Sequence, residues 1–477
     1  MAKISGVVTS VRVSHNQRDN IYNVIRSLSG TVNAGVVRIK SDIILKTMEI
    51  IEAEEVSRDG EGVVSCSVTV QGRISKEDYG SLSDAMVSGI GLHEPDISGF
   101  QSHLVSMMER CLPDLKYAAA LLIRNMVSGS PISIHFHADG DGSSGAIALY
   151  RAMKMVYASI GGSEAGVRWS STRGISYNDE LFYIDQMLIG SYESADRPIV
   201  LVTDFGSTSE SNGYMAKISE MADLIWIDHH PPDKRFDSKL IRCNTNPWNN
   251  GGSSSLTAGF MTSVLAEMIC GNSMSDMMHV SLISDHSEYA KPDSKFDEIS
   301  IVLEAMNTYH ESYKSPTPQS FESVMRDKER FSSIYNEYTE QMESSISIGK
   351  SKSKRYKSSK GFTIYALDFE KIAKMNFNYI KLGRYTSELH SAIERDSPES
   401  ITLVYYKKYV SIRASRSVAA ESILLNLINH LIEKNDDVEG GGGHKEAVSV
   451  KIASGEIKDV VVDIVSYLGG KSESANP

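Results

Sequence analysis

Residues 224–232 read Leu-Ile-Trp-Ile-Asp-His-His-Pro-Pro, an apolar run that ends in one acid and two imidazoles. Such a run is typical of a strand buried on both faces, and the prolines that follow cannot continue it. The triplet Asp228-His229-His230 therefore predicts a strand end with reactive side chains. Because a single Asp in this position usually caps a turn or helix, the pattern has to recur before it indicates a site.

The same pattern recurs through the middle of the chain. Each expected strand runs into an acidic residue: Ile132–Phe136 before His137, Asp139 and Asp141; Ile199–Thr203 before Asp204; Leu224–Ile227 before Asp228; and Val280–Ser284 before Asp285. The segment Ser144–Ala158, after the first run, has apolar residues at helical spacing. Strands that alternate with helices predict a parallel sheet, in which the carboxyl ends of the strands line one crevice.

A crevice with this many acids and imidazoles favours metal ions, because its charges would repel one another unless cations lay among them. Oxygen and imidazole ligands suit Mn²⁺ or Mg²⁺ better than a structural zinc. The four cysteines (Cys66, Cys111, Cys243 and Cys270) are far apart and form no CxxC pair. The ligands suffice for two metals that share a carboxylate and activate water for attack on phosphorus, so the residues predict a metal-assisted phosphoesterase.

The ordered motifs HADGDG, TDFG, IDHHPP and SD resemble those of the DHH phosphoesterase superfamily, with Asp228-His229-His230 as its namesake triplet. The sequence Gly441-Gly442-Gly443-His444 resembles the GGGH motif of the DHH-associated domain. Within the superfamily the chain is most similar to archaeal RecJ-like exonucleases, some of which associate with the replicative GINS complex. Since no residue of the four acidic motifs is replaced, the resemblance implies an active enzyme.

The resemblance also implies roles for single residues. It makes metal ligands of His137, Asp139, Asp141, Asp204, His229 and Asp285. Two divalent ions are implied, Mn²⁺ preferred and Mg²⁺ possible, with Asp204 as their bridge and with His230 facing the scissile phosphate. His135 lies two residues before His137, at the position where some relatives carry their ligand, so both histidines are candidates for the first motif.

The C-terminal part of the chain contains candidate residues for binding a nucleic-acid strand. The resemblance assigns substrate binding to Arg413, Ser415, Gly441, Gly442, Gly443 and His444. Glycines let backbone N–H groups approach a phosphate closely, although a flexible loop is the alternative reading of the run. The following HKEAVS keeps only some of the small residues that usually end this motif, which bears on substrate contacts. The basic stretch Gly349–Gly361 is either a solvated linker or a segment that tracks nucleic acid.

The 477 residues suffice for two or three domains. We expect an α/β protein with an N-terminal α+β segment of unknown role over 1–100, a parallel-sheet DHH domain over 101–346, a basic linker over 347–361, and a smaller α/β DHH-associated domain over 362–477. In the first segment, Ile4–Val13 and Val63–Val70 are typical of strands, Asp42–Glu55 has a helical pattern, and Gly89–Gly99 is typical of a linker.

The formal net charge of −12 argues, taken alone, against a nucleic-acid partner. However, Gly349–Gly361 and Arg413–Arg416 offer local positive charge. No apolar run is long enough to span a bilayer, and the N-terminus lacks the hydrophobic segment of a signal peptide. We therefore expect a cytoplasmic protein with no membrane partner.

Together these observations predict a metal-dependent exonuclease that hydrolyses single-stranded DNA or RNA to mononucleotides, in DNA replication, DNA repair or RNA processing. One alternative is a DHH phosphodiesterase for oligoribonucleotides or cyclic dinucleotides. Another is a replisome scaffold that binds GINS, with residues 1–100 as its docking module and nuclease activity secondary. Neither the cleavage polarity, nor the choice between DNA and RNA, nor the oligomeric state is encoded in any motif.

Overall fold

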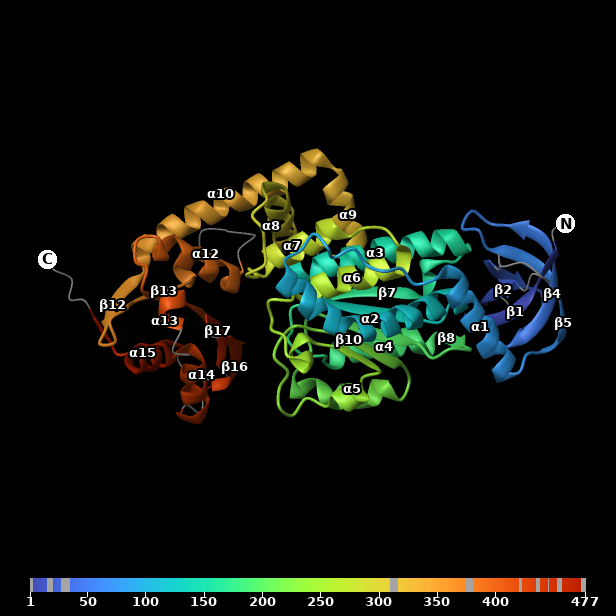
Figure 1. The fold of residues 1–477 in the computed structure, drawn as a ribbon, viewed down its shortest axis with the longest axis horizontal. Coiled ribbons are helices and arrows are strands. Elements are labelled where there is room, and N and C mark those ends of the chain that lie inside the picture. Colours follow the sequence, from blue (N-terminus) through green and yellow to red (C-terminus); the bar gives the residue numbers. More distant parts are fainter. Residues whose placement is uncertain are drawn as a thin grey trace. The chain divides into compact units, whose positions relative to one another are not determined.

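The computed structural model describes residues 3–14, 20–26, 35–308, 316–373, 381–419, 423–434, 438–444, 446–452 and 457–472. The chain divides into two compact units (Figure 1). The first comprises residues 1–307 and 313–328, and the second comprises residues 308–312 and 329–477. Each unit has its own sheets and its own hydrophobic core.

The first unit begins with a small β-barrel. Its strands are β1 (Lys3–Arg12), β2 (Ile21–Arg26), β3 (Val36–Ser41), β4 (Glu49–Arg58) and β5 (Val64–Arg73). They pair in the order β1-β2-β3-β5-β4, and β4 pairs back to β1, so the sheet closes on itself. A further strand, β8 (Tyr192–Ser194), pairs with β1 from outside the ring. Residues such as Val8, Tyr22 and Ile39 fill the barrel.

The barrel confirms two predicted strands and corrects a predicted helix. The runs Ile4–Val13 and Val63–Val70 fall on β1 and β5. The helix expected over Asp42–Glu55 is wrong, because Glu49–Arg58 is the strand β4. Along β4, Ile51 and Ala53 are buried while Glu52 and Glu54 are exposed. This alternation with a period of two is that of a half-buried strand.

A five-stranded parallel sheet forms the centre of the first unit. Its order is β11 (Cys243–Thr245), β10 (Asp223–Ile227), β9 (Ile199–Thr203), β6 (Ile132–His137) and β7 (Val167–Thr172). All four neighbouring pairs are parallel, as the alternating pattern predicts. Helices α2 (Ser102–Ser128), α3 (Gly140–Ile160), α6 (Ala258–Cys270) and α7 (Ser275–Ser284) pack on one face, and α4 (Asp179–Gly190) and α5 (Asn212–Ser219) on the other. The remaining helices of this unit are α1 (Lys76–Ile90), α8 (Ser294–Thr308) and α9 (Pro318–Arg326).

The fourth strand expected in this sheet, Val280–Ser284, is wrong. Residues Ser275–Ser284 form helix α7, and Asp285 is its C-cap. Val280 and Leu282 are buried in the same core as α3 and α6. A short apolar run has no periodicity that separates a buried helix from a buried strand, so this error follows from the length of the segment.

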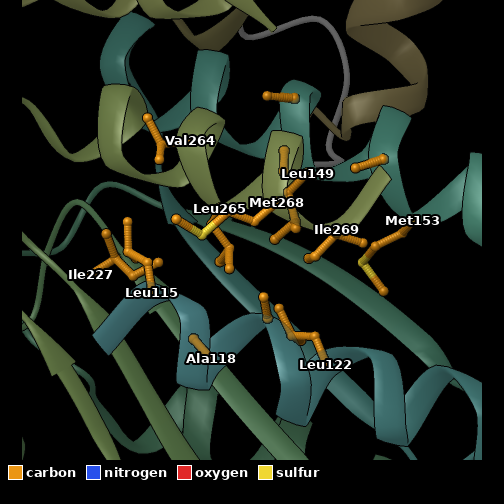
Figure 2. Close-up of a cluster of buried hydrophobic side chains, with 14 of the residues drawn as sticks. Leu115, Ala118, Leu122, Leu149, Met153, Ile227, Val264, Leu265, Met268 and Ile269 are labelled. Carbon is orange, nitrogen blue, oxygen red and sulfur yellow. The ribbon is translucent and has the colours of Figure 1, made fainter. Parts of the chain in front are cut away.

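Most side chains of the core between the sheet and its larger helix layer are aliphatic or methionine, and Figure 2 shows part of it. It contains Leu115, Ala118 and Leu122 of α2, Leu149 and Met153 of α3, Val264, Leu265, Met268 and Ile269 of α6, and Ile227 of β10. Fully burying one such large side chain contributes about 1.5–3 kcal/mol. This core therefore fixes α3, α6 and β10, whose ends carry the polar motifs.

The second unit is built on a seven-stranded mixed sheet. Its order is β16 (Val438–His444), β17 (Ala447–Ile452), β15 (Tyr409–Ala414), β14 (Ser400–Tyr406), β13 (Thr363–Asp368), β12 (Lys354–Ser358) and β18 (Gly470–Ser472). The helices are α10 (Lys328–Lys352), α11 (Glu370–Ala373), α12 (Leu382–Glu394), α13 (Arg416–Ala419), α14 (Ile423–Lys434) and α15 (Ile457–Tyr467). The protein is thus of the mixed α/β class, with an additional β-rich segment at its N-terminal end.

Two segments of the second unit are more regular than their composition indicates. The basic stretch Gly349–Gly361 is the end of α10 followed by β12, which pairs with both β13 and β18, and is not an unstructured linker. The glycine run lies within β16 and pairs with β17, so it is not a free loop. Within the described ranges, no helix is both long and apolar enough to cross a membrane.

Candidate metal centre

The polar motifs of the central sheet lie together at the carboxyl ends of its strands. His137 ends β6, Asp204 follows β9, and Asp228-His229-His230 follows β10. Because these three strands are neighbours and parallel, their ends meet at one edge of the sheet. Asp285 reaches the same place from the end of α7, where its Oδ2 lies 3.7 Å from Nδ1 of His229.

One group of possible ligands consists of His137, Asp139 and Asp204. Nδ1 of His137 lies 2.5 Å from Oδ2 of Asp139 and 3.7 Å from Oδ2 of Asp204. Asp139 also caps helix α3, since its Oδ1 accepts a hydrogen bond from the N–H of Gly142 at 3.0 Å. A Cβ at Gly142 would overlap the backbone of His137, so the motif needs glycine there. The ligand atoms of this group lie within 4.8 Å of one another.

A second group consists of Asp204, His229 and His230, and it shares Asp204 with the first. Nδ1 of His229 donates to the carbonyl of Ser254 at 2.8 Å, because a carbonyl can only accept. This bond turns Nε2 of His229 towards Asp204, whose Oδ1 lies 3.3 Å away. The ligand atoms of these three residues also lie within 4.8 Å of one another, so either group could hold a metal ion.

Asp204 has the geometry of a residue held in place for a ligand. Its φ is +69°, a left-handed conformation that Asp adopts at less cost than most residues. Its N–H donates to the carbonyl of Ile227 at 2.9 Å, which ties it to β10. Its Oδ2 is buried and, within the described residues, accepts no hydrogen bond. A buried carboxylate oxygen without a donor is costly, and a divalent cation would satisfy it.

The pKa values of the groups in the centre also favour a bound cation. Burial raises the pKa of Asp141 well above its usual range, and the charge of Asp204 adds to this effect. Burial raises the pKa of Asp285 to about 6, although His229 opposes it. Burial alone would lower the pKa values of His137 and His229, but the neighbouring carboxylates outweigh it and raise both. The centre therefore attracts protons strongly, and a divalent cation would take their place. These donors and charges fit Mn²⁺ or Mg²⁺.

Asp141 borders both groups but belongs to neither. Its carboxylate accepts hydrogen bonds from the N–H groups of Ala258 (3.1 Å) and Gly259 (3.0 Å) and from the hydroxyl of Ser281. It therefore sits at the N-terminus of α6, where the helix dipole favours a negative charge. Its Oδ2 lies 3.9 Å from Nε2 of His229, so one edge of the carboxylate faces the second group.

Asp228, the first residue of the triplet, has a role that sequence reasoning missed. It is fully buried, and its carboxylate accepts hydrogen bonds from the N–H groups of Ser207 (3.2 Å) and His230 (3.1 Å). Its Oδ1 also lies 2.8 Å from Nδ1 of His230. The protein around the half-exposed imidazole would lower the pKa of His230 by partial desolvation, but Asp228 outweighs this effect and raises that pKa. The available signal was its place next to the buried strand, which indicates a side chain turned into the protein.

The two histidines of the first motif lie in different surroundings. His135 is fully buried, and its Nε2 lies 2.8 Å from Oδ1 of Asp185. The Oδ2 of Asp185 accepts a hydrogen bond from the hydroxyl of Tyr177. Strand alternation puts His135 and His137 on the same face of β6, with His135 deeper in the sheet. His137 is therefore the one that lies among the acidic groups.

The second unit places its predicted binding residues on neighbouring strands. Arg413 of β15 pairs with Ala447 of β17, which pairs with His444 of β16, so Arg413 and His444 share a row across the sheet. The glycines Gly441, Gly442 and Gly443 precede His444 along the edge strand. Ser415 is buried, and its hydroxyl lies 3.3 Å from that of Ser400 rather than beside Arg413.

The guanidinium of Arg413 is held by neutral groups. It donates to the hydroxyls of Ser387 (2.9 Å) and Ser411 (3.2 Å) and to the carbonyl of Gly383 (3.3 Å). Sequence reasoning missed Ser411, which lies two residues before Arg413 and therefore on the same face of β15. Burial lowers the pKa of Arg413 to about 10. Among the residues that the structure describes, no carboxylate pairs with this guanidinium.

Comparison with known proteins agrees with this architecture. Residues 131–286 match the model of the DHH family, N-terminal domain. The uncharacterized protein MJ1198 of Methanocaldococcus jannaschii is 26% identical over 410 residues, which cover 75% of this chain and 54% of the relative. The chain thus spans about half the length of that curated relative.

One solved structure is similar in fold over most of the chain, and a second gives a weaker match. The DHH domain of PF0399, described as a member of the s1p family of ribosomal proteins, has a TM-score of 0.70 at 21% identity, over 82% of this chain and 97% of that one. RecJ from Thermus thermophilus in complex with Mn²⁺ has a TM-score of 0.45 at 14% identity, over 75% of this chain and 54% of that one. Residues 131–286 therefore match the N-terminal domain of the DHH family, and the fold of the chain is similar to that of a solved DHH domain.

Proposed function

We propose that this protein is a metal-dependent exonuclease that hydrolyses single-stranded DNA or RNA and releases mononucleotides. The observation that carries the proposal is Asp204, a buried carboxylate shared by two groups of possible ligands at the carboxyl edge of a parallel sheet. This sharing supports a pair of divalent cations with Asp204 as the bridge. Asp141 and Asp285, which border the groups, would add further carboxylate oxygens.

The residues of the chain would prepare the site for attack on a phosphodiester. Bound divalent cations would supply an activated water and neutralise charge on phosphoryl oxygens. Asp204 is fixed by its bond to Ile227, and His229 by its bond to Ser254, so their ligand atoms are positioned in advance. Such rigid positioning is what distinguishes a reactive centre from a group of mobile surface acids.

His230 suits the stabilisation of charge that develops on a phosphoryl oxygen. Its contact with Asp228 favours the protonated imidazole, which can donate a hydrogen bond to an anionic oxygen. Its side chain is 55% exposed, unlike the 3% of His229, so a substrate can reach it. In this proposal His229 is the metal ligand of the triplet, with Asp141 and Asp285 close enough to complete its group, and His230 faces the substrate and does not bind a metal ion.

Arg413 supports a substrate with phosphates. A guanidinium that has no carboxylate partner in the described part of the chain keeps a positive charge that is not neutralised and that can attract a phosphodiester. His444 in the same row and the edge-strand glycines would extend this surface. The choice of an exonuclease among phosphoesterases is supported by the resemblance of the ordered motifs to those of RecJ-like enzymes.

Digestion of single-stranded DNA and RNA, labelled at either end, tests the proposal. With Mn²⁺ or Mg²⁺ we expect release of labelled mononucleotides from one end, and no release in EDTA. The variant Asp204→Asn should lose this activity. The matched control Asp237→Asn, at an exposed position, should keep it. Full cleavage by Asp204→Asn would contradict the bridging role.

The length of the substrate separates the exonuclease from its alternative. A small-substrate phosphodiesterase would cut cyclic dinucleotides or very short oligoribonucleotides and leave longer strands intact, whereas an exonuclease degrades long strands to the end. The same series, run with DNA and RNA of equal sequence, also reports the preferred nucleic acid and the polarity.

A further inference from the structure

A half-open cavity lies between the N-terminal barrel and the central sheet. Gly129 and Ser130, just before β6, and Gly166, just before β7, line it, so it lies at the amino-terminal edge of the sheet. The cavity is small, and part of it is open to solvent. The metal centre is at the other end of β6, roughly 20 Å away for a strand of this length. The cavity is therefore separate from the candidate catalytic site.

The barrel wall of this cavity carries two arginines. It consists of Arg12, Ile21, Asn23 and Arg38, which come from three adjacent strands. Arg12 pairs with Ile21 across β1 and β2, and Asn23 pairs with Arg38 across β2 and β3, so the two arginines lie on one patch of the outer surface. Tyr157, Ser163 and Tyr192 line the cavity as well.

The positive charges of Arg12 and Arg38 both affect the pKa of the Tyr192 hydroxyl, which lines the cavity. Burial raises the pKa of Tyr192, and the charges of Arg12 and Arg38 oppose this rise. Arg38 also donates to the backbone carbonyl of Glu61. Within the described residues, neither arginine forms an ion pair with a carboxylate, and Glu164, which is adjacent in sequence to two lining residues, does not line the cavity. Two uncompensated positive charges thus border an accessible space.

The barrel has the strand arrangement of a common fold that binds nucleic acid on one of its outer faces. Its closed strand order, with β3 and β5 parallel, is that of the OB-fold barrel. In that fold the face of strands 2 and 3 binds single-stranded nucleic acid. Here the cavity lies on the outer face of β1, β2 and β3. The outer face of β4 is acidic instead, with Glu52 and Glu54 exposed, so phosphates would be directed to the basic side.

We propose that this cavity is a second nucleic-acid site, in which Arg12 and Arg38 bind backbone phosphate of a single strand. The site needs no metal and goes beyond the hydrolysis proposed above. Binding measured in EDTA excludes the metal centre, and the loss of binding on replacing Arg12 and Arg38 separates the cavity from the surface at Arg413, so failure of either proposal is distinguishable from failure of the other.

Binding of a short fluorescent oligo(dT) to the full chain in EDTA tests the site. The variant Arg12→Gln/Arg38→Gln should bind about tenfold more weakly or worse, as expected for lost charge-assisted phosphate contacts. The slope of log affinity against log salt should become shallower by about 1.4, the value for two phosphate contacts on a single strand. The control Arg58→Gln/Arg73→Gln removes the same charge from β4 and β5, outside the cavity, and should leave both quantities unchanged.

A lysine variant and two small phosphate ligands serve as further tests of the site. If thermal melting shows that the glutamine variant is unfolded, Arg12→Lys/Arg38→Lys keeps the charge but loses the planar two-point geometry, and intermediate affinity supports the proposal. Unchanged oligonucleotide binding in a folded variant overturns it. Tighter binding of adenosine monophosphate or inorganic phosphate than of the oligonucleotide, abolished by the same variant, also overturns it, because the site would then serve a free phosphate ligand.

Discussion

Asp204 has a left-handed backbone conformation and is buried. Within the described residues, one of its carboxylate oxygens accepts no hydrogen bond. Such a residue serves binding at the expense of folding, since its charge is desolvated without a full set of partners. We therefore expect Asp204→Asn to abolish cleavage while leaving the melting temperature in EDTA equal or higher. Asn tolerates a positive φ and removes the repulsion with Asp141. A large loss of stability in EDTA would show that Asp204 is structural.

Asp228 is expected to act through His230 and not on the substrate. In Asp228→Asn the single amide oxygen can still accept from the N–H group of either Ser207 or His230, which bond to different oxygens of Asp228, but the charge that favours the imidazolium is gone. The pKa of His230 should fall, so the alkaline limb of the kcat–pH profile should move to lower pH, by roughly one unit or more. The variant His230→Gln should have no such limb. An alkaline limb that stays in place would remove Asp228 from this role.

For single residues, the sequence predicts which side chains lie together at the edge of the sheet, but it does not predict the contacts that each one makes. Acids after buried strands identify the edge of the sheet where His137 and Asp204 lie. The choice between His135 and His137 depends on depth along β6, and alternation alone gives both the same face. Similarly, the hydroxyl of Ser415 turns inward to Ser400, a detail that is set by how β14 and β15 meet.

At the scale of elements, periodicity predicts the long segments and fails for short or unusual ones. The helix after β6 has a clear apolar period and is present as α3. The run that became α7 is too short and too uniformly apolar to show a period. Glycines have no side chains, so the glycine run of β16 shows no alternation of apolar and polar residues. It forms a strand because its backbone pairs with β17.

The packing of α6 against Asp141 gives a prediction for an element. A Cβ at Gly259 would overlap the backbone oxygen and the carboxylate of Asp141, so Gly259→Ala should lower the free energy of unfolding by about 1–3 kcal/mol. It should also weaken Mn²⁺ binding, because Asp141 would shift. The control Gly213→Ala, in α5, meets no atom within 4 Å and should be neutral or stabilising by about 0.5–1 kcal/mol. Urea unfolding of both variants measures the difference, and equal values would contradict the close contact.

For the whole molecule, the formal net charge of −12 conceals a division into local regions. The acids of the metal centre lie at one end of the central sheet, and the cavity with Arg12 and Arg38 lies at the other. A sum over the sequence cannot report this separation, because it depends on which strand ends meet. The charge therefore indicates good solubility and does not exclude a nucleic-acid substrate.

Metal binding should couple to the stability of the whole first unit in a pH-dependent way. The raised pKa of Asp285 means that its folded form holds a proton longer than its unfolded form, so stability falls as pH rises from about 4 to about 6. The raised pKa values of His137 and His229 contribute stability below their usual range, which is lost as pH rises through the folded values. Both effects leave the protein without metal less stable at alkaline pH, where deprotonated ligands bind a cation best.

The expected outcome is a larger rise of the melting temperature on adding Mn²⁺ at about pH 8 than at about pH 5, because protons compete with the cation at the lower pH. Comparison with and without metal at each pH cancels the titration of groups elsewhere in the chain. The variant Asp204→Asn should show little rise at either pH, since it removes the carboxylate common to both ligand groups. An equal or larger rise at pH 5 would mean that the cation binds outside this centre.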